Sequence, residues 1–164
     1  AGVCRGDHTM SDAVFTRHAS LDDAAAIAPL LDKYREFYGE ASDLTRSTAF
    51  IQQRFYLGES IIIVALVNNE IIGFTQLFPS FSSVTLERLW ILNDLYVEAS
   101  KRRAGVGLAL LNAAKTFAET TGAKQLFIEG ADDNPKARNL YTRFGFIENT
   151  AYHYYHLPLK PIQG

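Results

Sequence analysis

The apolar positions near the N-terminus change from a short extended run to a helical spacing. Residues 13–17 predict a first strand. After Ser20, apolar residues recur three or four positions apart, which predicts a helix that ends near Gly39. Ser20 is a suitable N-cap, and a second helix is predicted to follow from a cap at Thr45 or Ser47.

The middle of the chain has the pattern of strands. Residues 61–67 and 71–78 are mainly apolar and have strand length, and the intervening Asn68-Asn69-Glu70 suits a hairpin turn. A polar loop is predicted over 79–83, and a longer strand over 86–97. These runs predict antiparallel pairing of successive strands.

The C-terminal part alternates between the two kinds of pattern. Helices are predicted over 106–121 and 135–144, and strands over 125–129 and 150–157. Hairpins followed by helical crossovers indicate a mixed sheet with helices on both faces. The expected fold class is therefore α/β (α+β).

Bulk composition narrows the possible functions. With 164 residues, 48% of them apolar, we expect a single domain over 10–164; residues 1–9 lack any pattern and are expected to be a tag remnant or a disordered tail. The net charge of −2 argues against nucleic-acid binding, and no apolar run is long enough to span a membrane. The single cysteine, Cys4, suits a reducing compartment, so we expect a cytoplasmic protein.

A glycine-containing loop joins the long strand to the helix that follows it. Its sequence is Arg102-Arg103-Ala104-Gly105-Val106-Gly107. The two glycines let the backbone approach a ligand, the first turn of the helix offers unpaired N–H groups, and the arginines suit phosphate oxygens. Many turns contain two glycines, so the loop by itself is weak evidence for a phosphate site.

A second segment carries polar residues at helical spacing. Asn134, Arg138 and Tyr141 are separated by four and then three positions, which places them on one helix face. Tyr141 therefore shares a groove with Asn134 or is a core aromatic residue with a solvated hydroxyl.

Together these segments resemble the GNAT superfamily of acyl-CoA-dependent N-acetyltransferases. The resemblance covers about residues 91–146 and depends on 93–97, 102–107 and 134–141, followed by Gly145-Phe146. It implies a mixed sheet of six or seven strands and acetyl-CoA as co-substrate. No metal is expected, because the four histidines and one cysteine are scattered without paired spacing. One departure is Arg103, which replaces a frequent glycine, although backbone amides still serve there.

The resemblance also implies where acetyl-CoA binds. The strand that contains Leu95 and Val97 would splay from its neighbour and pair with the pantetheine arm, the glycine loop would hold the pyrophosphate, and Asn134 would contact the pantetheine region. Lys136, Arg138 or Arg143 would reach the adenosine phosphate. The implied cofactor-binding residues are Leu95, Tyr96, Val97, Arg102, Arg103, Ala104, Gly105, Val106, Gly107, Leu108, Asn134, Ala137 and Tyr141.

Direct attack of an amine on the thioester poses two proton-transfer problems. An alkylamine with a pKa of about 10.4 costs about 4.6 kcal/mol to present neutral at pH 7, so a carboxylate base is needed. Asp94 and Glu87 are the first candidates, with His153 and His156 as distant ones; Asp94 also suits a structural acceptor, and Glu87 an exposed surface position. The resemblance places Tyr141 at the general acid that protonates the departing thiolate.

An aromatic cluster in the first predicted helix is the candidate acceptor site. The resemblance places this helix beside the acceptor, and Tyr34, Phe37 and Tyr38 would contact it. Residues 21–46 hold six acids and three bases, a balance of −3, which favours a cationic acceptor unless they form an ordinary solvated face. We expect a primary amine, either a small polyamine-like amine or a lysine-type amino group.

Two other functions remain compatible with the glycine loop. One is a non-catalytic acyl-CoA-binding or sensing module on the same fold. The other, a dinucleotide-binding unit, is disfavoured because the loop follows a late strand and an acidic ribose partner is missing about 20 residues on. Dimers are common among relatives, and Tyr152, Tyr154 and Tyr155 are candidates for a homodimer interface.

Overall fold

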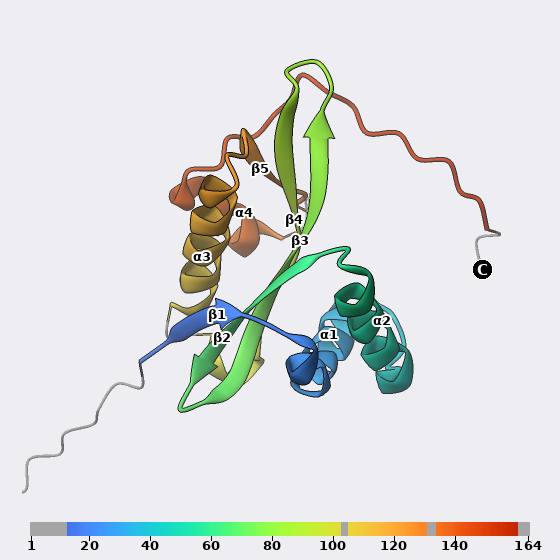
Figure 1. The fold of residues 1–164 in the computed structure, drawn as a ribbon, viewed down its shortest axis with the longest axis vertical. Helices are drawn as coiled ribbons and strands as arrows, with labels where there is room; N and C mark the ends of the chain where they lie inside the picture. Colours follow the sequence, from blue (N-terminus) through green and yellow to red (C-terminus); the bar gives the residue numbers. More distant parts are fainter. Residues whose placement is uncertain (1–12, 103–104, 131–133, 161–164) are drawn as a thin grey trace, which may run out of the picture. The chain divides into compact units, whose positions relative to one another are not determined.

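The protein is described by a computed structural model over residues 13–102, 105–130 and 134–160. The chain forms two compact units, residues 1–129 and 130–164. The first unit contains the sheet and three α-helices, and the second contains a fourth helix and an extended C-terminal segment (Figure 1).

The sheet of the first unit is mixed, as predicted. Its strand order follows the chain, from β1 to β5, and the first four strands are antiparallel to their neighbours, whereas β5 is parallel to β4. The sequence resemblance implied six or seven strands, but the described residues form five. The strands are β1 (Phe15–His18), β2 (Ile61–Val67), β3 (Glu70–Ser82), β4 (Glu87–Val97) and β5 (Gln125–Ile128).

Helices cover both faces of this sheet (Figure 1). The helices α1 (Ala24–Phe37) and α2 (Leu44–Leu57) bury one face, where Ile62 and Val64 of β2 join their core. The helix α3 (Val106–Thr120) packs on the opposite face, next to Ile63. Because successive side chains of a strand point to opposite faces, β2 is apolar on both. Two short 3₁₀ turns, η1 (Leu21–Asp23) and η2 (Ala99–Lys101), precede α1 and follow β4.

A glycine allows α3 to lie close to the sheet. A Cβ atom at Gly73 would be 2.9 Å from the carbonyl oxygen of Tyr96 and 3.4 Å from Leu110 of α3. A larger residue would therefore push β3 away from β4 or from the helix.

The β3–β4 hairpin is longer than the sequence predicted. The expected loop over 79–83 is wrong, because β3 continues to Ser82 and Pro79 pairs with Trp90. Proline lacks an N–H group, but β2 ends its pairing with β3 at Leu77, so no ladder bond on that side is lost. The turn from β2 to β3 was predicted correctly, and Asn68 and Asn69 both adopt positive φ, as a type I′ turn requires.

The predicted cap of the second helix is also wrong. Neither Thr45 nor Ser47 caps it; the carboxylate of Asp43 accepts the N–H of Arg46 at 3.0 Å. Ser47 is buried and its hydroxyl donates to Asp32 of α1 at 3.0 Å instead. Ser47 suits a helix cap by residue type, but its tertiary contact with Asp32 uses the hydroxyl that would have made the cap.

In the second unit, the helix α4 (Pro135–Phe144) was predicted and is present. The strand predicted over 150–157 is wrong, since the described residues 145–160 form neither a strand nor a helix. Their alternating aromatic residues suit a strand, but a strand exists only where a neighbour satisfies its backbone groups. Tyr152, Tyr154 and Tyr155 are 79%, 80% and 86% exposed.

Candidate active site

The last residues of β4 have an open edge, because no strand of the described residues pairs with them on the side away from β3. The parallel partner β5 pairs with β4 only from Leu89 to Leu92. On the other side, the N–H of Glu98 donates to Ile72 of β3 at 2.8 Å. Because bonded pairs alternate in an antiparallel ladder, the main-chain groups of Leu95 and Val97 point away from β3, toward the side that β5 has left. This edge can pair with an extended ligand.

A bulge begins the open segment. Gln76 of β3 lies opposite Asp94, whereas the next residue, Leu77, lies opposite Leu92, so Asn93 is the extra residue of β4. A bulge of this kind re-aims nearby side chains. Asp94 and Tyr96 turn toward α1 and are buried, whereas Asn93 is exposed.

The start of α3 has the features of an anion site. Gly105 adopts φ of 69° at the N-cap, and no side chain among the described residues caps the helix. The first intrahelical bond runs from the N–H of Ala109 to Gly105, which leaves the amides of Val106, Gly107 and Leu108 without a helical partner. The helix dipole and these amides favour a phosphate group.

Arg102 connects the anion site to the open edge. Its Nε donates to the carbonyl oxygen of Val97 at 3.0 Å, and its guanidinium carbon lies 5.5 Å from the centre of the Tyr96 ring. The side chain therefore lies at the end of β4. The predicted residues Arg103 and Ala104 fall outside the described residues.

Asp94 is a buried carboxylate without a cationic partner among the described side chains that act on it. Its Oδ2 accepts from Nε2 of Gln76 at 2.7 Å, and its Oδ1 accepts from Nδ2 of Asn93 at 3.1 Å. Burial raises the pKa of Asp94 above its ordinary value, although hydrogen bonds from Gln76, Asn93 and Tyr34 oppose that change. A carboxylate with a raised pKa is a stronger base than an exposed one.

An aromatic layer from α1 and β4 lies beside this carboxylate. The hydroxyl of Tyr34 donates to the carbonyl oxygen of Asn93 at 3.4 Å. Its ring centre is 5.0 Å from that of Tyr38 and 6.2 Å from that of Tyr96. Burial and the charge of Asp94 raise the pKa of the Tyr34 hydroxyl, which therefore stays protonated. Phe37 contacts Tyr38 edge-on at 5.3 Å, so the three residues predicted to bind the acceptor lie together.

Glu87 does not join this group. It begins β4, seven residues before Asp94, which corresponds to about 23 Å of strand. Its carboxylate is 3.7 Å from Nζ of Lys124, and both side chains are partly exposed. Of the two candidate bases, the structure brings only Asp94 to the aromatic layer and the open edge of β4.

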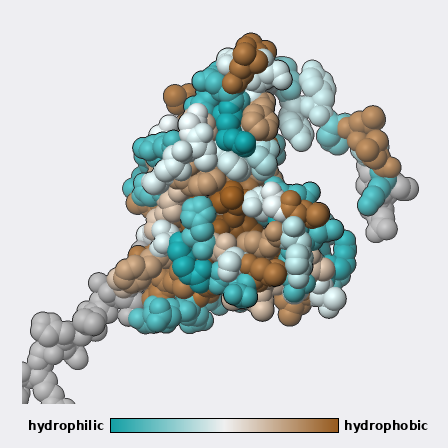
Figure 2. Space-filling view, viewed as in Figure 1, coloured by the Kyte–Doolittle hydropathy of each residue, from teal (hydrophilic) through white to brown (hydrophobic). Residues whose placement is uncertain are grey.

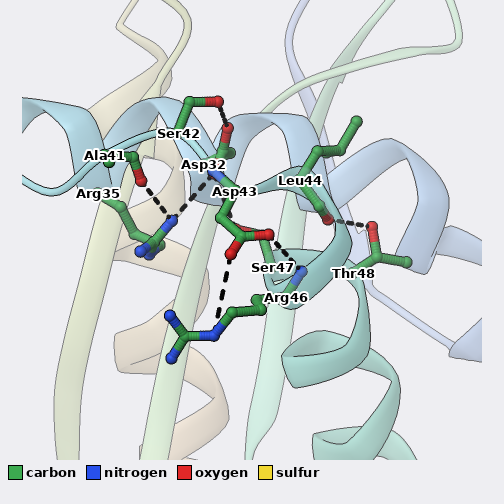
Figure 3. Close-up of polar contacts among 9 residues, drawn as sticks. All are labelled: Asp32, Arg35, Ala41, Ser42, Asp43, Leu44, Arg46, Ser47 and Thr48. Atoms are coloured by element: carbon green, nitrogen blue, oxygen red, sulfur yellow. Dashed lines mark hydrogen bonds and ion pairs between the residues drawn. The ribbon is translucent and has the colours of Figure 1, made fainter.

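Several of the acids counted for the acceptor site have structural contacts (Figure 3). Asp32 accepts from the hydroxyls of Ser42 and Ser47, the amide of Asp43 and the guanidinium of Arg35. These hydrogen bonds, led by that of Ser42, lower the pKa of Asp32 to about 2. Asp23 likewise pairs with Arg17 at 2.8 Å. Asp32 and Asp23 therefore join α1 to α2 and fix the start of α1, respectively.

The second unit holds the remaining predicted residues. Asn134 caps α4 through its side-chain oxygen, which accepts the N–H of Ala137 at 3.2 Å. Tyr141 is half-buried, and its ring centre lies 5.9 Å from that of Phe146. A Cβ atom at Gly130 would be 3.8 Å from the same ring. His153 and His156, the distant candidates for a base, are exposed.

The sequence analysis missed a pair of polar residues behind Asp94. Gln76 is 1% exposed, and its Oε1 accepts from the hydroxyl of Ser60 at 2.8 Å. One signal was available, because Gln76 and its neighbour Thr75 are polar residues within a mainly apolar, buried stretch of β3. A buried glutamine needs hydrogen-bond partners, and the strand pattern by itself does not name them.

Comparison with known proteins identifies the family. The profile of the acetyltransferase (GNAT) family matches residues 27–146. Over 139 residues the chain is 50% identical to the uncharacterized N-acetyltransferase YhfO of Bacillus subtilis, covering 85% of this chain and 93% of that protein. It is 36% identical over 108 residues to a probable acetyltransferase of Haemophilus influenzae, covering 65% and 74% of the two chains. A crystal structure of a probable acetyltransferase superposes with a TM-score of 0.84 at 40% identity, covering 90% of this chain and 99% of the other. The chain therefore belongs to the GNAT family and is an acetyltransferase.

The described part of the chain shows two further absences. Its residues contain no group of three or more His, Cys, Asp or Glu side chains arranged to hold a metal ion. None of the helices in the same ranges is long and apolar enough to cross a membrane. GNAT proteins generally use acetyl-CoA, whose phosphates and pantetheine arm suit the unpaired amides of α3 and the open edge of β4.

Proposed function

We propose that this protein transfers the acetyl group of acetyl-CoA to a primary amine, with Asp94 as the general base. The observation that carries this proposal is the position of Asp94. It is a buried carboxylate with a raised pKa, beside both the open edge of β4 and the aromatic side chains of α1. A carboxylate in this place can take the proton from the amine, directly or through a water molecule.

The cofactor would bind along two features of the first unit. The amides of Val106, Gly107 and Leu108, together with the Arg102 side chain, would hold the pyrophosphate. Leu95 and Val97 would pair with the pantetheine arm, whose amide groups match an open strand edge. The carbonyl oxygen of Val97 already accepts from Arg102 and has a second lone pair that can accept from the arm.

Tyr141 and Asn134 of the second unit complete the proposal. Tyr141 would protonate the departing thiolate of coenzyme A, since an ordinary tyrosine has a pKa of about 10 and keeps its proton at pH 7. Asn134 would contact the pantetheine region with its amide nitrogen, because its oxygen already caps α4. Support for both roles comes from the family resemblance of this segment.

The acceptor would be a cation in solution that enters between aromatic side chains. Tyr34, Tyr38 and Phe37 offer ring faces that attract an ammonium group, and Asp94 supplies the charge that draws it inward. A small polyamine-like amine and a lysine-type amino group both satisfy these conditions. Phe37 and Tyr38 are 63% and 57% exposed, so the entrance is accessible to either.

Release of free thiol from acetyl-CoA, followed with a panel of primary amines, tests the proposal. Asp94→Asn is expected to lower kcat about 100-fold or more, and Tyr141→Phe about 10-fold or more, as loss of a general base or acid requires. Glu87→Gln is expected to lose far less, because its carboxylate pairs with Lys124 at the other end of β4. Equal turnover by wild type and Asp94→Asn would reject Asp94 as the base. Tight binding of acetyl-CoA without transfer to any amine would favour the sensing module.

A further inference from the structure

Gln76 and Ser60 form a hydrogen-bonded chain behind Asp94. The hydroxyl of Ser60 donates to Oε1 of Gln76 at 2.8 Å, and Nε2 of Gln76 donates to Oδ2 of Asp94 at 2.7 Å. Gln76 lies directly opposite Asp94 in the β3–β4 ladder, at the last paired position before the bulge. The chain therefore runs from the loop before β2 through β3 into the carboxylate.

Burying Gln76 and Asp94 costs desolvation free energy that apolar side chains would not cost. Gln76 and Asp94 are 1% and 6% exposed, and every neighbour of Gln76 along β3 from Gly73 to Leu77 is buried. Two facing apolar side chains would fill the same space without any polar group to desolvate. The pair is thus not the arrangement that would best stabilise this part of the sheet.

The orientation of the glutamine decides what it does to Asp94. An amide can present either its oxygen or its NH₂ group, and an ionised carboxylate only accepts hydrogen bonds. The NH₂ group of Gln76 therefore faces Asp94, and its amide oxygen accepts from the Ser60 hydroxyl on the other side. A donor at that position favours the ionised carboxylate and opposes the effect of burial.

The other groups that face Asp94 do not replace this effect. On its own strand, Asn93 donates to the other oxygen, Oδ1. From α1, Tyr34 is the titratable side chain that acts on Asp94, and it keeps its proton at neutral pH. Among the described residues that act on Asp94, the hydrogen bond from Gln76 lowers its pKa the most and so gives the main support to the ionised form.

We propose that Gln76, whose amide oxygen is anchored by Ser60, is a positioning residue that holds the Asp94 carboxylate ionised and aimed at the acceptor amine. This inference rests on the proposed role of Asp94 as the base. Oδ2 is fixed by Gln76 through the neighbouring strand, whereas Oδ1 accepts from the exposed Asn93 of the same strand. Oδ1 is accordingly the oxygen that takes the proton.

Carboxyl ¹³C NMR across a pH titration tests the inference without depending on activity. The Asp94 signal is assigned by its loss in Asp94→Asn. Gln76→Met keeps the side-chain volume but removes the hydrogen-bond donor. In this variant the pH at the midpoint of the Asp94 carboxyl titration is expected to rise by about one pH unit or more. Ser60→Ala, which removes the contact that anchors the amide oxygen of Gln76, is expected to move the midpoint in the same direction by less. An unchanged midpoint in both variants would overturn the inference.

The pH dependence of kcat/KM then separates this inference from the proposed function. The acid limb of this profile, where kcat/KM rises as Asp94 loses its proton, is expected to move to higher pH in Gln76→Met. The KM for acetyl-CoA is expected to stay unchanged. Thr75→Val is the matched control, because Thr75 is equally buried and donates to the main-chain oxygen of Asp94 at 2.8 Å, not to its carboxylate. It is expected to leave the limb in place. Failure of the wild type to acetylate any amine would reject the proposed function, whereas a limb that moves equally in Thr75→Val would reject only the role of Gln76.

Discussion

Two aspartates of the first unit have different pKa values and different roles because their surroundings differ. Asp32 receives hydrogen bonds from four donors, which lower its pKa to about 2 and make it a permanent anion that joins α1 to α2. Asp94 is buried with fewer donors and no cationic partner in the described chain that acts on it, which raises its pKa. The first arrangement stabilises the fold, and the second sacrifices stability at a place that suits chemistry.

Asp94→Asn is therefore expected to make the protein more stable at pH 7 while it removes activity. A raised pKa in the folded state means that ionisation opposes folding above the ordinary pKa of an aspartate, near 4. The neutral amide avoids that cost, and we expect a gain of about 1 kcal/mol in the free energy of unfolding. Urea denaturation at pH 7 measures it. A large loss of stability would indicate that the ionised carboxylate is a structural acceptor.

Asp32→Asn is expected to do the opposite, with the opposite dependence on pH. The lowered pKa of Asp32 contributes stability that is complete above an aspartate's ordinary pKa, near 4, and is lost as the pH falls toward about 2. The urea midpoint of the variant should be lower than that of the wild type at pH 7, and the gap should narrow below pH 4. Asp22→Asn, at an exposed position nearby, is the control. A gap independent of pH would show that the carboxylate charge is not responsible.

At the scale of elements, the site depends on where regular structure stops. The pairing of β4 with β5 ends at Leu92, the bulge at Asn93 turns Asp94 inward, and α3 starts without a side-chain cap. Each interruption leaves backbone groups of β4 or α3 without a regular partner. A ligand with phosphates and amide groups can satisfy them, which explains why these interruptions adjoin one another.

Leu108→Asp tests the anion site at the start of α3. An acidic residue in the first turn interacts favourably with the helix dipole, so stability is expected to stay equal or rise by about 0.5 kcal/mol. The same charge would repel the pyrophosphate, and we expect affinity for coenzyme A to fall about 10-fold or more. Calorimetric titration with coenzyme A measures this, with the uncharged Leu108→Asn as the control. Equal affinities in the two variants would place the phosphates elsewhere.

At the scale of the whole molecule, the extended C-terminal segment exposes apolar and aromatic side chains. Leu157 and Leu159 are 81% and 89% exposed, and the side chains of Tyr152, Tyr154 and Tyr155 are exposed to a similar degree. Figure 2 shows hydrophobic surface on this segment. Soluble monomers rarely leave such a set of side chains in water. We propose that the segment contributes to a homodimer.

Sedimentation equilibrium tests the homodimer. The wild type is expected to sediment as a dimer, and a variant with Tyr152, Tyr154 and Tyr155 all changed to serine as a monomer. Tyr56→Ser on α2 is the matched control, since Tyr56 is 75% exposed on a regular element. A monomeric wild type, or a triple variant that remains dimeric, would exclude this interface.

The sequence predicted most of the fold because its signals are local. Apolar spacing located α1, α3 and α4 and the strands β2, β4 and β5, and the Asn68-Asn69 turn set the β2–β3 hairpin. The glycine loop correctly marked the start of α3. The errors arose where a segment distant in the sequence determines the local structure. Ser47 bonds to Asp32 instead of capping α2, and β3 continues through Pro79 because its pairing with β2 has already ended. Residues 150–157 form no strand.

By itself, the sequence determined the order of the elements, the mixed sheet and the family, because hydrophobic periodicity, turn residues and the glycine loop act over a few neighbouring positions. Only the tertiary structure distinguished the two candidate carboxylates from each other. Asp94 and Glu87 lie on one strand and look alike in the sequence, but one is buried beside Gln76 and Tyr34, and the other pairs with Lys124 near the surface. Burial and hydrogen bonding are set by residues far apart in the chain, and these set the pKa of a carboxyl group.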